Sequence, residues 1–164
     1  MSILFEELAN RIRSEIPDLD RIVQKIQQAW SHARRASEEQ DFYVDSVALN
    51  LHSFYTGLER LFEMIARRVD LILPNGETWH RDLLKQVTQD LAGVRPAVIG
   101  SESALVLDKY RRFRHLVHNV YAVNLVPDKM AELISDLPGM WDRLRQEMLA
   151  FAEFLEDLSH VGEE

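Results

Sequence analysis

The sequence of 164 residues contains no cysteine, which excludes disulfide bonds, thiolate metal sites and cysteine nucleophiles. This absence fits a reducing cytoplasm, which is where we expect the protein. Glycine and proline are scarce, with six and five copies, so few turn signals interrupt the chain. No apolar run approaches the ~20 residues that span a bilayer. The N-terminus meets acidic residues at once, so we expect no secretory signal.

Positive charge is also in deficit. The chain has 19 lysines and arginines against 27 acidic residues, for a formal net charge of −8 and a pI of about 5.3. This balance argues against a broad nucleic-acid-binding surface, so any RNA contact must be focused on a small basic patch. The hydrophobic content of 46% at this length predicts one compact domain over residues 1–164, with a flexible acidic tail at 160–164.

Apolar residues recur every three or four positions through most of the chain, and no stretch alternates with period two. We therefore expect an all-α, single-domain up-and-down bundle of five or six helices. Pro17 is expected to begin the second helix, and Pro138-Gly139 to kink or divide the last one. The expected helices span 2–16, 17–37, 44–69, 78–91, 101–124 and 127–159.

The segment from Lys109 to His118 has the opposite charge balance, with four fixed cations and two histidines. At about 100° per residue, Arg114, His118 and Tyr121 can converge on one small object at the edge of an apolar helix face. A guanidinium binds phosphate oxygens, and an imidazole exchanges protons near neutral pH. From the residues alone, a plainer interpretation is favoured, in which the basic helix face pairs with neighbouring carboxylates.

The segment Phe113–Tyr121 resembles the signature of HEPN-fold ribonuclease toxins of the HepT-like group. That signature has an arginine, a histidine five residues later and a tyrosine two residues after the histidine. Phe54–Arg60 on the long predicted helix and Thr78–His80 at the start of the short one also resemble the group's layout. The similarity spans roughly residues 20–158 and implies a HEPN-like bundle.

The resemblance assigns roles to single residues. Arg114 matches the arginine that grips the scissile phosphate, and Tyr121 matches the tyrosine that a partner nucleotidyltransferase antitoxin of the MNT type modifies with AMP. The chain departs from the signature at Asn119, which stands where the histidine is usual. His118 lies one residue earlier and is our preferred replacement, and His115, directly after the arginine, is the alternative.

The family resemblance implies the toxin component of a toxin–antitoxin system, a metal-independent endoribonuclease that acts on tRNA or other cellular RNA. The ribose 2′-OH would be the nucleophile, so no metal or cofactor is expected. A two-fold homodimer would bring two copies of the motif together, with Lys109, Arg111 and Arg112 as further phosphate contacts. The alternative is a catalytically inactive HEPN-fold binding module that pairs with, or is modified by, a nucleotidyltransferase. Asn119 favours this alternative.

Two acidic residues, Glu59 and Glu63, lie one turn apart on the long predicted helix. Glu59 can support the site by orienting Arg114 across the bundle. Surface pairs with Arg60 and Arg67 are the favoured interpretation of both carboxylates.

His80 opens a predicted helix directly after Trp79, and a structural contact with the preceding turn is favoured over a contact with a ligand. The histidines elsewhere in the chain have no partners at ligand spacing, so no metal site is predicted.

Overall fold

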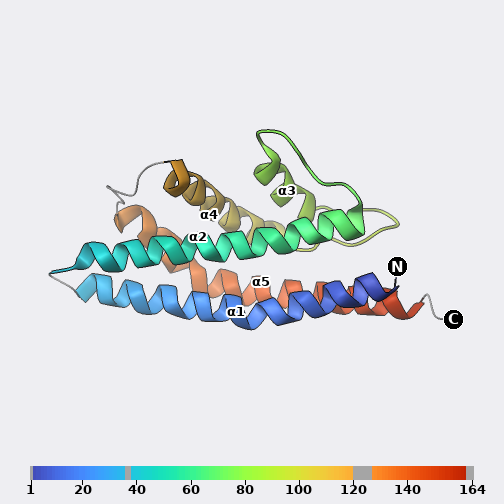
Figure 1. Ribbon diagram of the computed structural model, residues 1–164, viewed down its shortest axis with the longest axis horizontal. Helices are drawn as coiled ribbons and strands as arrows, with labels where there is room; N and C mark the ends of the chain where they lie inside the picture. The colour runs from blue at the N-terminus through green and yellow to red at the C-terminus, as the bar shows by residue number, and fades with distance from the viewer. Residues whose placement is uncertain (1, 36–37, 120–126, 162–164) are drawn as a thin grey trace.

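The computed structural model describes residues 2–35, 38–119 and 127–161, with the backbone alone for 115–119 and 127. Within these ranges there is no β-strand beyond one isolated bridge, between Leu91 and Arg95. The all-α prediction is therefore confirmed. The helical elements are α1 (Ser2–Arg35), α2 (Gln40–Ile65), the π-helical turn η1 (Ala66–Asp70), α3 (Trp79–Val87), α4 (Ser101–Asn119) and α5 (Pro127–Val161) (Figure 1).

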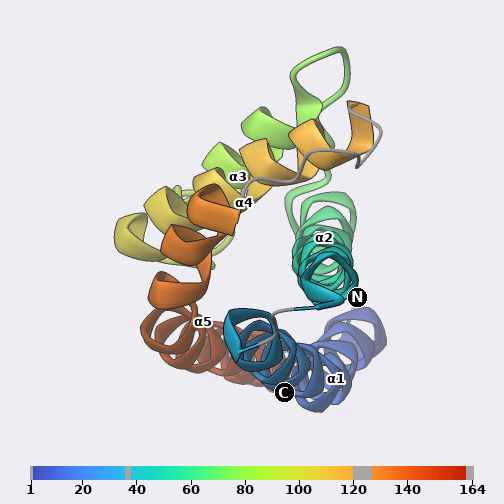
Figure 2. The same cartoon turned by 90° about the vertical axis from the view of Figure 1, so that its left-hand side faces the viewer.

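The four long helices alternate in direction along the long axis of the molecule, as Figure 1 shows for α1, α2, α4 and α5. α1 packs on both α2 and α5, and α4 lies against α2 and α5 on the other side. The short α3 contacts α2 and α4 and lies outside the main bundle (Figure 2). This arrangement is the expected up-and-down bundle, with α3 as a lateral addition.

The predicted helix boundary at Pro17 is wrong, because α1 continues through it. An internal proline costs a helix about 3 kcal/mol through its missing N–H and the clash of its ring. The buried residues keep their helical spacing on both sides of Pro17, so one continuous apolar face packs on α2 and α5 and offsets that cost. The buried residues of this face are Leu8, Ala9, Ile12, Ile16, Leu19, Val23, Ile26 and Ala33.

Pro138 likewise lies inside α5 and does not divide it into two helices. Figure 2 shows the first turns of α5 inclined to the remainder, in line with the predicted kink. The bend lets the start of α5 reach α4, where the hydroxyl of Tyr110 donates a hydrogen bond to the carbonyl of Leu133 at 2.5 Å.

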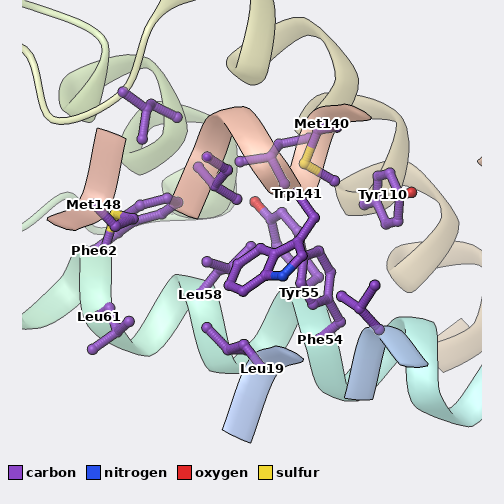
Figure 3. Packing of buried hydrophobic residues seen from close by; sticks show 14 of the residues in the cluster. Leu19, Phe54, Tyr55, Leu58, Leu61, Phe62, Tyr110, Met140, Trp141 and Met148 are labelled. Atoms are coloured by element: carbon purple, nitrogen blue, oxygen red, sulfur yellow. The ribbon is translucent and has the colours of Figure 1, made fainter. Parts of the chain in front are cut away.

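The core centres on aromatic residues from three helices (Figure 3). The ring of Phe54 on α2 makes an edge contact with Trp141 of α5 at 5.6 Å and a tilted contact with Tyr110 of α4 at 6.0 Å between centroids. The indole N–H of Trp141 donates to Asp20 of α1 at 3.0 Å. Because Tyr110 and Phe113 are buried, the next residue, Arg114, lies at the edge of the core between α2 and α3.

The loop over residues 88–100 is fastened by a buried ion pair that the sequence did not reveal. Arg95 contacts Asp70 through Nε at 2.5 Å and Nη2 at 2.7 Å, and both side chains are 0% exposed. Nη1 of Arg95 donates to the carbonyls of Gln89 and Pro96, and Nη2 also donates to that of Gln86. All five guanidinium N–H groups are therefore used. This loop ends α3 at Val87, earlier than predicted.

Candidate functional site

The site begins with Arg114, which α4 presents toward α2. Its Nη1 donates to the Oε1 of Glu59 at 2.7 Å, and its Cζ lies 6.0 Å from the ring centroid of Tyr55. The side chain is 24% exposed, so the guanidinium reaches solvent on one side while it contacts an aromatic floor on the other.

Glu59 lies on α2 and is buried, with 4% of its side chain exposed. Its second oxygen, Oε2, contacts the Nδ1 of His80 at 2.7 Å. A buried carboxylate is costly unless charged or polar donors satisfy it, and here two charge-assisted contacts do so. The favoured interpretation of Glu59 as a surface partner of Arg60 and Arg67 is wrong, and the contact with Arg114 across the bundle is present.

His80 is the second residue of α3, and its ring lies against that of Trp79, with centroids 3.6 Å apart and the ring planes tilted by 30°. The side chain is 34% exposed. The expected contact with the preceding turn is wrong, because the partner of His80 is Glu59 on α2. The local sequence pattern does not reveal the role of His80, because its partner lies 21 residues away. The sequence feature that pointed to a role for His80 in the site was its place next to Trp79 at the start of a predicted helix.

The three side chains form one polar cluster, defined by Glu59, His80 and Arg114, that joins α2, α3 and α4. The Nη1 of Arg114 lies 3.4 Å from the Nδ1 of His80. Among the side chains that the structure describes, only Nη1 of Arg114 has a hydrogen-bond partner. The N–H groups on Nε and Nη2 of Arg114 therefore meet no acceptor among those side chains. The cluster can therefore accept an anion from its solvent side.

The phenol below this cluster is not a proton-transfer group at neutral pH. Burial raises the pKa of Tyr55 well above its ordinary value, and the negative charge of Glu59 raises it further. The neutral ring serves as an apolar support for Arg114.

The other basic residues of α4 have acidic partners. Asp108 pairs with Arg111 and Arg112, each at 2.8 Å, and Lys109 donates to Glu132 at 2.7 Å. The hydrogen bond to Glu132 raises the pKa of Lys109. These pairs match the plainer interpretation of the basic helix face and offset much of its charge. A role of the three cations in RNA binding stays a prediction.

Four of the predicted site residues lie beyond what the structure describes. His115, His118 and Asn119 belong to the last turns of α4, where the backbone alone is described, and Tyr121 lies outside the described residues. Their assigned roles stay predictions. Arg114 and Glu59 are the predicted residues that the structure brings together, and His80 joins them.

No group of three or more His, Asp or Glu side chains lies close enough to hold a metal ion in the part of the chain that the structure describes. In the same ranges, every helix falls short of the length and apolar character needed to cross a membrane.

The alternating helices form an all-α bundle with an arginine-centred cluster at its edge. The family model described as HepT-like protein matches residues 46–155, which run from α2 into α5 and include the whole polar cluster. This match covers more than half of the chain, and the protein belongs to the HepT-like family. No curated protein and no solved structure matches the chain significantly.

Proposed function

We propose that this HepT-like protein is the toxin component of a toxin–antitoxin system, a metal-independent endoribonuclease that acts on tRNA or other cellular RNA. The observation that carries the proposal is Arg114, which is held on buried Glu59 beside an imidazole and has N–H groups without an acceptor among the described side chains. The RNA supplies its own nucleophile, the ribose 2′-OH. The protein must therefore stabilise the charge on the phosphate and move protons.

In this proposal Arg114 binds the scissile phosphate, and His118 transfers a proton, with His115 as the alternative. Arg111, Arg112 and Lys109 hold flanking phosphates. The protein acts as a two-fold homodimer, because one helix offers too few groups to surround a phosphate. Sedimentation at micromolar concentration tests the assembly, and a strictly monomeric species contradicts it.

The function is tested by incubating purified protein with mixed tRNA in EDTA. We expect cleavage that leaves 2′,3′-cyclic phosphate ends. Arg114→Ala should lower the rate by roughly 10²–10⁴, as the loss of a charge-stabilising group does. Arg21→Ala is the matched control, because Arg21 is an exposed arginine on α1 with a local acidic partner. Cleavage by Arg114→Ala at the control rate would contradict the proposal.

The partner in this system is a nucleotidyltransferase antitoxin that attaches AMP to Tyr121. The AMP phosphate would then compete with RNA for Arg114. With a cognate nucleotidyltransferase and ATP, intact mass spectrometry should show one adenylyl group on the wild type and none on Tyr121→Phe. Modification that persists undiminished on the variant removes Tyr121 from the proposal.

One observation favours a second function, a binding module without cleavage activity. Asn119 stands at the position where the family signature has its histidine. If the pure dimer leaves tRNA and mixed cellular RNA intact, with and without divalent ions, and still pairs with or is modified by the nucleotidyltransferase, this second function replaces the first.

A further inference from the structure

We infer that His80 is a catalytic residue, the general base that removes the proton from the attacking 2′-OH. It would supply, beside His118, an imidazole that this chain lacks at Asn119, where the signature has its histidine. The inference rests on the proposed ribonuclease function and assigns a role to a residue on a different helix from the motif.

The contact with Glu59 fixes the protonation pattern of the imidazole. A carboxylate accepts hydrogen bonds, so the short contact of 2.7 Å requires the hydrogen on Nδ1 of His80. In the neutral ring the lone pair then lies on Nε2. A carboxylate that orients a histidine base in this way is a recurring arrangement in enzymes that activate a hydroxyl.

Among the described residues, Nε2 of His80 remains available. Both described polar contacts of the ring use Nδ1, and no described residue forms a hydrogen bond with Nε2. The ring is 34% exposed, and its close contact with the Trp79 ring restricts its rotation. The base is therefore oriented on one edge and open on the other.

The phosphate-binding group lies next to this base. The Nη1 of Arg114 is 3.4 Å from the Nδ1 of His80, so a phosphate on the open N–H groups of Arg114 lies beside the imidazole. The charged groups in contact with the ring are Glu59 from α2 and Arg114 from α4, and Arg81 follows it on α3. Tyr55, below Arg114, is neutral.

The inferred step moves one proton from the 2′-OH to His80 and exchanges one P–O bond for another. The 2′-oxygen attacks phosphorus, its proton passes to Nε2 of His80, and the O2′–P bond forms as the P–O5′ bond breaks. The departing 5′-oxygen takes a proton from His118, in keeping with the role proposed above. The products are a 2′,3′-cyclic phosphate and a 5′-hydroxyl, and proton exchange with water returns both histidines to their starting states.

A structural role for His80 would explain the same contact, because the imidazole also satisfies buried Glu59. The variant His80→Asn separates the two roles. Its amide nitrogen occupies nearly the place of Nδ1 and can still donate to Glu59, but no atom replaces Nε2. His32→Asn is the matched control, since His32 on α1 stacks on Tyr43 and has no contact with the polar cluster.

The experiment measures tRNA cleavage in EDTA against pH and tRNA retention on filters. His80→Asn should bind tRNA like the wild type but cleave it roughly 10²–10⁴-fold more slowly, as expected when an acid–base group is lost. Its rate should lose the rise on the acid side of the pH profile that deprotonation of a base produces. Added imidazole should restore part of the activity of His80→Ala. His32→Asn should behave like the wild type.

The possible failures are distinct. If the wild type and His80→Asn cleave equally, or if the slower variant keeps the acid-side rise, the role of His80 is overturned while the ribonuclease function stands. If Arg114→Ala is inactive and His80→Asn is as active as the wild type, the ribonuclease function again stands and the role of His80 is overturned. If the wild type cleaves no RNA, the proposed function and the inference fail together. Should His80→Asn not fold, imidazole rescue of His80→Ala decides, and its absence overturns the inference.

Discussion

Two buried carboxylates in this protein, Asp70 and Glu59, each hold an arginine from a distant part of the chain. Around Asp70 both partners are fully buried, and Arg95 uses all five of its N–H groups. Around Glu59 the carboxylate is buried, but its partner Arg114 is 24% exposed and keeps N–H groups without an acceptor among the described side chains. The same ion-pair chemistry therefore fastens a loop in one place and forms an open site in the other.

The difference follows from position in the fold. Asp70 ends η1, where the loop over 88–100 brings backbone carbonyls around the guanidinium of Arg95. Glu59 lies within α2, between two helices whose backbone groups are already paired. A guanidinium that meets helices instead of a loop finds fewer carbonyl acceptors and retains binding capacity.

The largest expected effect concerns the fully buried ion pair of Asp70 and Arg95. Arg95→Met leaves Asp70 buried without its cation and should lower the free energy of unfolding by about 3–5 kcal/mol. Arg114→Met should lower it less, by about 1.5–3 kcal/mol, because Glu59 keeps His80 and Arg114 is partly solvated. Urea unfolding followed by circular dichroism measures both. Equal losses of unfolding free energy for the two variants, or a larger loss for Arg114→Met, would contradict the distinction between the two ion pairs.

A second effect appears at alkaline pH. Burial raises the pKa of Tyr55, in the floor of the open site, and of Tyr110, away from it. The unfolded chain ionises near the ordinary value of 10.0 while the folded phenols stay protonated, so above this pH the folded state binds more protons and stability falls. Each such tyrosine should lower the free energy of unfolding by about 1.4 kcal/mol per pH unit above this value.

Urea unfolding from about pH 9 to about pH 11 measures this slope. Tyr55→Phe and Tyr110→Phe should each remove one tyrosine's share of it. A Tyr55→Phe variant with the wild-type slope would mean that water reaches the phenol, so the floor of the open site would not be closed.

The smallest effect concerns the cations around the open site. If Arg112 contacts an RNA phosphate, Arg112→Ala should reduce the salt dependence of tRNA binding by about one unit of log–log slope. Arg112 is 74% exposed and paired with Asp108, and Arg21 on α1 is a comparable exposed arginine. Arg21→Ala should leave the slope unchanged, and identical slopes for both variants would remove Arg112 from the RNA contact.

The local pattern of the sequence was sufficient for the helical class and most of its elements. Apolar spacing of three and four residues predicted the helices and the core, and the Arg114 segment carried the resemblance that the family match confirms. The same local rules failed at Pro17, because the preference of one residue for a helix end is worth less than continuous burial on two neighbouring helices.

The tertiary structure decided which polar residues meet. Glu59 and Arg114 are 55 residues apart, and Glu59 and His80 are 21 apart, so no periodic signal links them. The sequence predicted Arg114 at a helix edge, but the packing of α2, α3 and α4 selected its partners. The path of the loop over 88–100 brought Arg95 to Asp70. Helix periodicity is a property of neighbouring residues, whereas the pairing of buried charges depends on where whole helices and loops come to rest.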